Sequence, residues 1–102
     1  MNLDQLIKGC IKQNSKAQEE LYNLYKKNLF VLSLKYCTNE AEAEDNLHNA
    51  FIDIFTNIKQ FKKTGSFEGW IKRITINKAI NTYKNNFQLV PIKEEVVQYW
   101  SH

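Results

Sequence analysis

The sequence predicts an all-α protein, folded as a compact bundle of three to four helices with a short C-terminal tail. The first observation is the scarcity of helix breakers. The 102 residues include three glycines and one proline, and that proline, Pro91, lies near the end of the chain. The second is that apolar residues recur at steps of three and four, the period of one helix face. The third is that residues suited to helix starts precede the apolar runs.

The length of the chain bounds the number of domains. A chain of 102 residues supports one hydrophobic core, and a hydrophobic content of 43% is enough to fill it. We expect this domain to occupy residues 1–86, with residues 87–102 as a linker remnant or a short docked helix. No apolar stretch is long enough to cross a membrane, and the N-terminus lacks the features of a signal peptide. The sequence therefore predicts a cytoplasmic protein.

A first helix is expected over about residues 2–13 and a second over about residues 16–37. Gln13-Asn14-Ser15 interrupts the apolar pattern between them. Ser15 with Gln18 has the spacing of a capping box, in which side chains bind the free amides of a helix start. The apolar stripe of the first helix is Leu3, Leu6, Ile7 and either Cys10 or Ile11. That of the second is Ala17, Leu21, Leu24, Tyr25, Leu29, Leu32 and Tyr36.

A third helix is expected over about residues 40–60 and a fourth over about residues 66–86. Asn39 and Glu42 have the spacing of a second capping box, and Ser66 is a good N-cap for the fourth helix. The residues that the third helix should bury are Leu47, Ala50, Phe51, Ile54, Phe55 and Ile58. Those of the fourth are Phe67, Trp70, Ile71 and Ile74, then Ala79 or Ile80, and Tyr83.

The net charge of +3 is small, but the charges are unevenly distributed. Residues 40–58 contain five acidic residues and no Lys or Arg, whereas residues 59–86 contain seven basic residues and one acidic residue. Adjacent acidic and basic segments suggest two different partners. The alternative is that two solvated helix faces simply differ in charge.

The sequence offers no set of residues for catalysis. The histidines are His48 and His102, no serine or cysteine lies in a nucleophile motif, and there is no Gly-rich phosphate loop. Asp45 and His48 could supply two metal ligands, but no matching pair occurs elsewhere, so neither a metal nor a cofactor is expected. Cys10 and Cys37 belong to no CxxC pattern and are expected to be ordinary thiols. We therefore do not expect an enzyme.

One candidate binding surface is the outer face of the third helix. Its residues share one side of the helix and are Asp45, His48, Asn49 and Ile52. Polar groups around one apolar residue suit contact with a helix of a partner protein. A solvated helix face would have the same spacing.

A second candidate surface combines the loop after the third helix with the outer side of the fourth. Cations interleaved with aromatic residues are typical of proteins that bind single-stranded nucleic acid. Asn side chains one turn apart can pair with base edges. We assign Phe67 and Trp70 to the core, which leaves the loop and the outer residues for DNA. These outer residues are Lys72, Arg73, Asn77 and Asn81.

Residues 43–51 read AEDNLHNAF, and residues 66–74 read SFEGWIKRI, followed in register by Asn77-Lys78-Ala79. The first segment resembles the AEDLVQEVF signature of extracytoplasmic-function sigma factors of bacterial RNA polymerase. The second resembles their SF-x-x-W-L-x-R-I segment, with the N-x-A that follows it. Residues 17–34 look like the family's AFEELYRRYYPRLLRLA helix. Together the resemblance covers about residues 5–86.

The resemblance implies that the chain is sigma region 2, a helical bundle that acts in transcription initiation. In that family the AED helix docks on the clamp-helix coiled coil of the beta-prime subunit. The loop and the helix after it melt and capture the minus-ten promoter element, and a base flipped from the non-template strand enters a pocket in that loop. We therefore expect RNA polymerase core and promoter DNA as partners, with an anti-sigma factor as a further candidate.

Carried over residue by residue, Asp45 matches the family Asp that faces the clamp helices, whereas His48 and Asn49 stand where Gln and Glu are usual. Arg73 and Asn77 match positions near the upstream edge of the DNA bubble. The base-capturing loop corresponds to Lys63, Thr64, Gly65 and Ser66. The expected polymerase-binding set is Asp45, His48, Asn49 and Ile52. The expected DNA-binding set is Lys62, Lys63, Thr64, Gly65, Ser66, Lys72, Arg73, Asn77 and Asn81.

Two alternatives stay open. One is a degenerate sigma-like module that binds a partner protein and no DNA, which His48 and Asn49 favour. The other is a helical domain that reads duplex DNA through a helix-turn-helix. The family also normally carries a second helical domain that reads the minus-thirty-five element. Residues 87–102 are too few to form that domain, so we expect that this chain does not recognise a full promoter by itself.

Overall fold

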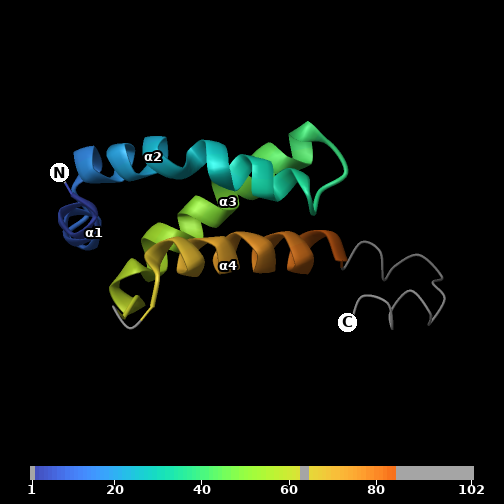
Figure 1. The fold of residues 1–102 in the computed structure, drawn as a ribbon. Coiled ribbons are helices and arrows are strands. Elements are labelled where there is room, and N and C mark those ends of the chain that lie inside the picture. The colour runs from blue at the N-terminus through green and yellow to red at the C-terminus, as the bar shows by residue number, and fades with distance from the viewer. Residues whose placement is uncertain (1, 63–64, 85–102) are drawn as a thin grey trace.

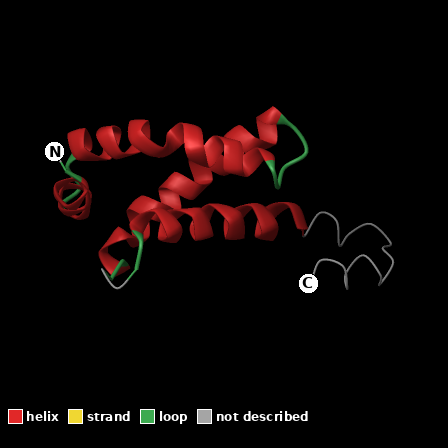
Figure 2. Cartoon of the chain, in the orientation of Figure 1, coloured by secondary structure: helices red, strands yellow, loops and turns green. Residues whose placement is uncertain are grey.

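The computed structural model describes residues 2–62 and 65–84, and their regular structure is entirely helical (Figure 2). The helices are α1 (Leu3–Ile11), α2 (Ser15–Leu34), α3 (Glu40–Asn57) and α4 (Phe67–Ala79). A 3-10 turn, η1 (Ile58–Gln60), extends α3, and a π-helical turn, η2 (Ile80–Lys84), extends α4. The predicted all-α class is confirmed. The predictions for Lys63, Thr64 and residues 85–102 lie outside the described residues.

The bundle is organised around α3. Helices α2 and α4 run in the same direction, and α3 runs against both (Figure 1). Contacts join α3 to α2 and to α4, and α2 also touches α4, so the three helices enclose one core. Helix α1 packs on α2 and η1 at one end of the bundle. Because α3 is antiparallel to α4, η1 and the first turn of α4 meet at that same end.

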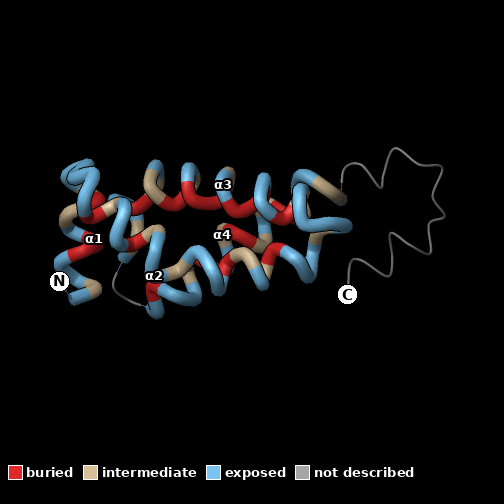
Figure 3. The backbone as a smooth tube through the Cα atoms, turned by 90° about the horizontal axis from the view of Figure 1, so that it is seen from above, coloured by how far each residue is buried: buried red, intermediate tan, exposed pale blue. Residues whose placement is uncertain are grey.

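The core consists largely of aliphatic and aromatic side chains. The buried residues lie on the sides of the helices that face one another (Figure 3). Its most deeply buried large members are Leu21, Leu29, Ile54, Ile58 and Ile71. The stripe predicted for α3 is confirmed, with Phe55 half-buried at its edge. Truncating one such side chain to Ala typically costs about 2–5 kcal/mol of stability, so this packing dominates the stability of the domain.

The stripe predicted for α2 is only partly right. Leu24 and Tyr36 are exposed by 56% and 40%, whereas Ser33, which was not predicted to be inside, is fully buried. The early part of α2 packs on α1, where Gly9 lies so close that an added Cβ would be 2.6 Å from that of Ala17. The later part packs on α3 and α4, so the buried side rotates along the helix. A single straight stripe cannot describe a helix whose neighbours change.

A polar cluster at the centre of the bundle ties three helices together. The side-chain amide of Asn46 on α3 donates to Ser33 Oγ on α2 at 3.0 Å and to the Thr75 carbonyl on α4 at 3.2 Å. Ser33 and Thr75 in turn donate their hydroxyls to the Leu29 and Ile71 carbonyls. These hydrogen bonds explain why a serine and a threonine are acceptable at buried positions. They also fix how α2 and α4 sit relative to α3.

The start of α2 differs from the prediction. Asn14, rather than Ser15, is the N-cap, and its side chain accepts a hydrogen bond from the Ala17 amide at 3.0 Å. Ser15 is the first helical residue, so the proposed pairing of Ser15 with Gln18 is wrong. Both Asn and Ser are favoured N-caps, and sequence spacing alone did not separate two adjacent candidates.

The starts of α3 and α4 agree with the prediction more closely. The Asn39 side chain accepts from the Glu42 amide at 2.8 Å, while the Glu42 carboxylate accepts from the Thr38 amide rather than from that of Asn39. Ser66 caps α4 by accepting from the Gly69 amide at 3.1 Å. Each such cap is worth about 1 kcal/mol, and the Ser66 cap fixes where α4 begins beside η1.

Candidate nucleic-acid and protein-binding surfaces

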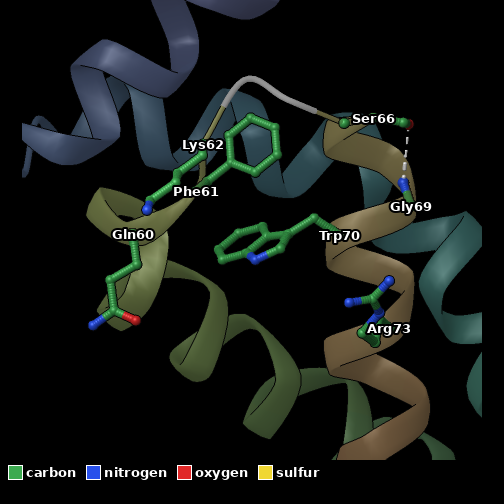
Figure 4. A pocket seen from close by; sticks show the side chains of 8 residues that line it. Gln60, Phe61, Lys62, Ser66, Gly69, Trp70 and Arg73 are labelled. Carbon is green, nitrogen blue, oxygen red and sulfur yellow. Dashed lines mark hydrogen bonds between the residues drawn. The ribbon is translucent and has the colours of Figure 1, made fainter.

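An open pocket lies where η1 meets the first turns of α4, and we call it the loop pocket (Figure 4). Its volume is about 370 Å³, which is within the range of small-ligand sites. Its lining residues are Gln60, Phe61, Lys62, Gly65, Ser66, Gly69, Trp70 and Arg73. Residues from both sides of the loop therefore meet in one cavity.

The rings of Phe61 and Trp70 form the wall of the loop pocket, and Phe67 packs against both of them. The Phe61 ring lies 5.2 Å from that of Phe67 and 5.3 Å from that of Trp70, measured between ring centroids. Phe67 is buried and anchors this cluster in the core, where its ring also packs on Tyr25 at 6.0 Å. Trp70 is only half-buried, and its ring extends from α4 toward the segment from Gln60 to Lys62 (Figure 4). The core thus holds a partly open aromatic surface rigidly in place.

The aromatic assignment made from the sequence is therefore half right. Phe67 belongs to the core as predicted, with an exposure of 5%, but Trp70 belongs to the core and to the pocket wall at once. A stripe of inward residues marks which side of a helix is covered. It does not tell whether the covering element leaves a gap, and here η1 and the loop leave one beside Trp70.

Two cations border the loop pocket. Lys62 and Arg73 are exposed and line it from opposite sides. Lys62 precedes the loop, and Arg73 lies on α4 about one turn after Trp70. Ser66 uses its hydroxyl oxygen as the acceptor that caps α4 (Figure 4). The pocket combines a flat aromatic wall with positive charge, the chemistry that holds a base and its phosphates.

The structure brings together only part of the predicted DNA-binding set. Lys62, Gly65, Ser66 and Arg73 line the loop pocket. Lys72 instead lines a groove between α2 and α4 and lies 4.0 Å from the carboxylate of Glu68. Asn77 and Asn81 are exposed farther along α4 and η2.

The predicted DNA-binding set does not include four lining residues of the loop pocket. They are Gln60, Phe61, Gly69 and Trp70. Phe61 and Trp70 carried a signal, because aromatic residues alternate with cations in this segment. Gln60 carried none, since its position depends on α3 ending in the 3-10 turn η1.

The outer face of α3 is the second candidate surface. Asp45, His48 and Ile52 are exposed and Asn49 is half-exposed, so the four predicted residues share one accessible side of the helix. Ile52 is 61% exposed, and Asn49 donates its amide to the Asp45 carboxylate at 3.3 Å. An exposed Ile beside a polar pair suits a protein contact, because such a contact would bury the apolar residue and keep the polar groups bonded.

Contacts from α4 and η2 reach α3 beside its outer face. Lys78 Nζ lies 2.9 Å from the carboxylate of Asp53, and the Tyr83 hydroxyl donates to the Glu42 carbonyl at 3.0 Å. Burial raises the pKa of Tyr83, with further contributions from Cys37, Asp45 and Glu42. Both contacts join the two helices that carry the candidate surfaces, so neither helix can turn without disturbing the other.

Residues 2–62 and 65–84 contain no group of three or more His, Cys, Asp or Glu residues that could hold a metal ion. No helix within these ranges has the length and apolar character required to span a membrane.

The chain matches known proteins over the same elements. The profile of the family described as Sigma-70 region 2 matches residues 21–86. The ECF RNA polymerase sigma factor SigW of Bacillus subtilis (strain 168) is 31% identical over 83 residues, which cover 78% of this chain and 44% of SigW. SigE of Mycolicibacterium smegmatis (strain ATCC 700084 / mc(2)155) is 32% identical over 59 residues, or 58% of this chain and 23% of that protein. The chain thus spans less than half the length of either relative.

A solved structure has the same fold. It is the NMR structure of the complex formed by an engineered region 2 of sigmaE with GTAAAA, and it superposes with a TM-score of 0.75. The match covers 90% of this chain and 100% of that chain, at 22% sequence identity. The chain therefore belongs to the Sigma-70 region 2 family, and the relatives named above are ECF sigma factors, so the resemblance seen in the sequence is confirmed.

Proposed function

We propose that this domain acts in transcription initiation by holding a base of the melted minus-ten element in the loop pocket while it docks on RNA polymerase core. The observation that carries the proposal is the loop pocket itself, in which Trp70 and Phe61 form a wall between Lys62 and Arg73. Stacking on an aromatic ring is worth about 1–3 kcal/mol per base and is available only to an unpaired base. A pocket of this kind therefore favours melted DNA over duplex.

The residues around the loop pocket have different roles in this proposal. The Trp70 ring offers a face on which a base stacks, and the Gln60 amide can both donate to and accept from a base edge. Lys62 and Arg73 neutralise phosphates and give affinity without sequence information. Lys63 and Thr64, from the base-capturing loop of the family resemblance, complete the proposed site. Such a domain works by differential binding to one form of DNA and needs no catalytic residue.

The outer face of α3 is proposed to contact the clamp helices of the beta-prime subunit. Ile52 supplies exposed apolar area, and Asp45 with Asn49 supplies a polar pair at its side. His48 completes the face and is exposed. In this proposal the functional domain covers residues 1–86, acts in the cytoplasm, and is open to control by an anti-sigma factor.

The remaining residues of the predicted set have a supporting part in the proposal. Asn77 on α4 and Asn81 on η2 are exposed beyond Arg73 and are assigned to the upstream edge of the melted region. Lys72 is assigned a weaker contribution, because it lines the groove beside α2 rather than the loop pocket.

A strand-specific binding assay tests the proposal. The probe is a fluorescein-labelled single strand of sequence GTAAAA, since that hexanucleotide is bound by the engineered region 2 of sigmaE with the same fold. Anisotropy is measured for the single strand and for a duplex containing it, with and without a beta-prime clamp-helix fragment. We expect tighter binding to the single strand, and further tightening with the fragment present. Equal affinity for single strand and duplex would contradict the proposal.

A control separates the two surfaces within that assay. Clamp-helix binding without any DNA binding would instead favour a sigma-like module that binds a protein partner only. A poly(dT) strand of the same length measures the part of the affinity that does not depend on base identity. The difference between the two strands then reports what the loop pocket contributes to sequence preference.

A further inference from the structure

The side of α2 opposite Ser33 carries exposed apolar residues that the proposed contacts with polymerase and DNA leave unused. Leu24 and Val31 are exposed by 56% and 49%. With Asn28 and Lys35 they fall at steps of four, three and four, so they form one continuous stripe along the helix. Single exposed apolar residues are normal on a protein surface, but a stripe with helical period indicates a contact surface.

A shallow groove lies beside this stripe, between α2 and α4. Its volume is about 280 Å³. Its lining residues are Lys27, Asn28, Val31, Leu32 and Lys35 from α2 and Lys72 from α4. The floor is apolar, the rim carries three lysines, and none of these lining residues is acidic.

The positive charge of the groove is weakly compensated. From Leu21 to its end at Leu34, α2 contains no acidic residue. Lys72 has an ion-pair partner in Glu68, but that contact is 4.0 Å long and its two side chains are about half exposed, so it contributes little. Long lysine stems also cover apolar surface while their ammonium groups stay in water, which suits them to the rim of such a groove.

We propose that this groove docks an acidic amphipathic helix of a partner protein. A helix with apolar residues at i, i+3 or i+4 and i+7 would cover Leu24 and Val31, and acidic residues flanking that stripe would meet Lys27 and Lys35. Nucleic acid fits less well, because its phosphates would contact the lysines but leave Leu24 and Val31 exposed. None of the described residues that line the groove has an aromatic ring on which a base could stack.

The groove is separate from the loop pocket although neighbouring residues line the two. Lys72 lines the groove and Arg73 lines the loop pocket, so α4 divides them. Occupation of the groove is therefore compatible with DNA in the loop pocket. The docked helix would add a partner to the domain without competing for either proposed contact.

The test uses a synthetic, fluorescein-labelled peptide with Leu at i, i+3, i+4 and i+7 and Glu at the flanking positions. Its anisotropy is measured against the chain and against Val31→Asp, with Ile52→Asp as the matched control at an exposed apolar residue of α3, outside the groove. We expect Val31→Asp to weaken binding about tenfold, because a central contact is replaced by a repelling charge. Ile52→Asp should change it less than about twofold. Circular dichroism verifies that each variant is folded.

The charge requirement is tested separately. Lys35→Glu should weaken binding of the acidic peptide about threefold at low salt and less at high salt, since salt screens an exposed charge pair. A peptide with Lys in place of Glu should not bind. The proposal is overturned if Val31→Asp leaves the affinity unchanged, if both peptides bind equally, or if single-stranded DNA displaces the acidic peptide from the groove.

Discussion

The loop pocket and the outer face of α3 are built in different ways. The face belongs to one helix, and its four residues share a side because of their spacing alone. The loop pocket is assembled from η1, the loop and α4, and its shape depends on how Phe61, Phe67 and Trp70 pack together. The face can thus be altered one side chain at a time. The pocket can also be lost through a change in packing beneath it.

The two regions nevertheless share one support. Asn46 on α3 holds α2 and α4 through its amide, so the helix that carries the face also sets the position of the helix that carries the pocket. The side-chain oxygen Oδ1 of Asn46 is buried and has no hydrogen-bond partner among the residues that the structure describes. An unsatisfied buried oxygen costs about 1–3 kcal/mol, which partly offsets what the two amide hydrogen bonds contribute.

The largest expected effect is on the loop pocket. Trp70→Ala should weaken binding of single-stranded GTAAAA about 5- to 100-fold, because it removes the stacking face of the wall. Trp70→Phe keeps a ring and should lose far less affinity for the single strand. Anisotropy titrations measure the affinity of both variants. If Trp70→Ala and Ile52→Asp weaken binding of the single strand equally, the division into two regions is wrong.

Asn46→Ala should come next and should act on both regions through the fold. It removes two hydrogen bonds and leaves a cavity, so the free energy of unfolding should fall by about 2–3 kcal/mol in a urea titration. Asn46→Leu fills the space and removes the unsatisfied oxygen, so it should lower the free energy of unfolding less than Asn46→Ala does. If Asn46→Leu lowers it more than Asn46→Ala, the polar cluster is a net source of stability.

The outer face of α3 should respond to Ile52→Asp. Replacing an exposed apolar contact by a charge should weaken binding to a beta-prime clamp-helix fragment about tenfold. Single-stranded DNA affinity, measured on the same preparation, should change by less than about twofold. Unchanged affinity for the fragment would remove this face from the proposed polymerase contact.

Arg73 and Lys72 provide a neighbouring pair that sharpens the outline of the DNA site. Arg73→Gln should reduce the slope of log affinity against log salt by about 0.7, the value for one phosphate contact with a single strand. Lys72→Gln should leave the slope almost unchanged, because Lys72 lines the groove on the other side of α4. Equal slopes for the two variants would mean that DNA follows a path outside the loop pocket.

The smallest expected effects are on the pKa values of two tyrosines, Tyr25 and Tyr83. Burial raises the pKa of Tyr25, which packs on Phe67, with a further contribution from Glu68. Burial also raises the pKa of Tyr83, which bonds to Glu42 on α3, with further contributions from Cys37, Asp45 and Glu42. Both raised values favour the neutral phenol in the fold. Their contribution to stability is therefore complete below the ordinary pKa of 10.0 and is lost as pH rises through the raised values.

Charge-removing variants distinguish those two tyrosines. Asp45→Asn should lower the pKa of Tyr83 and leave that of Tyr25 unchanged, and Glu68→Gln should do the reverse. Carbon-13 NMR of the tyrosine Cζ signals follows each titration separately. A shift of both tyrosines in either variant would indicate that the change spreads through the bundle.

The sequence was sufficient for features that depend on local spacing. The four helices, the α3 stripe, and the caps at Asn39 and Ser66 follow from periodicity and from the chemistry of helix starts. The shared exposed side of α3 follows from the same periodicity. These features involve residues within a few positions of each other, so one sequence contains the information.

Features that depend on how helices meet were missed. Ser33 is buried and bonded to Asn46 of another helix, and Lys72 lines the groove between α2 and α4 rather than the loop pocket. Trp70 becomes a pocket wall because η1 ends where it does. None of these facts is contained in the spacing of one segment.

An NMR titration is the most direct measurement of a base in the loop pocket. The nitrogen-15-labelled chain is titrated with single-stranded GTAAAA, and the indole N–H of Trp70, assigned with Trp70→Phe, is followed. We expect the chemical shift of this indole signal and those of the Phe61 and Gly69 amides to change most on DNA binding. The chemical shifts of the amides from Asp45 to Ile52 should not change. An unperturbed Trp70 indole at saturating DNA, or the same perturbation by duplex, would contradict a base-holding pocket.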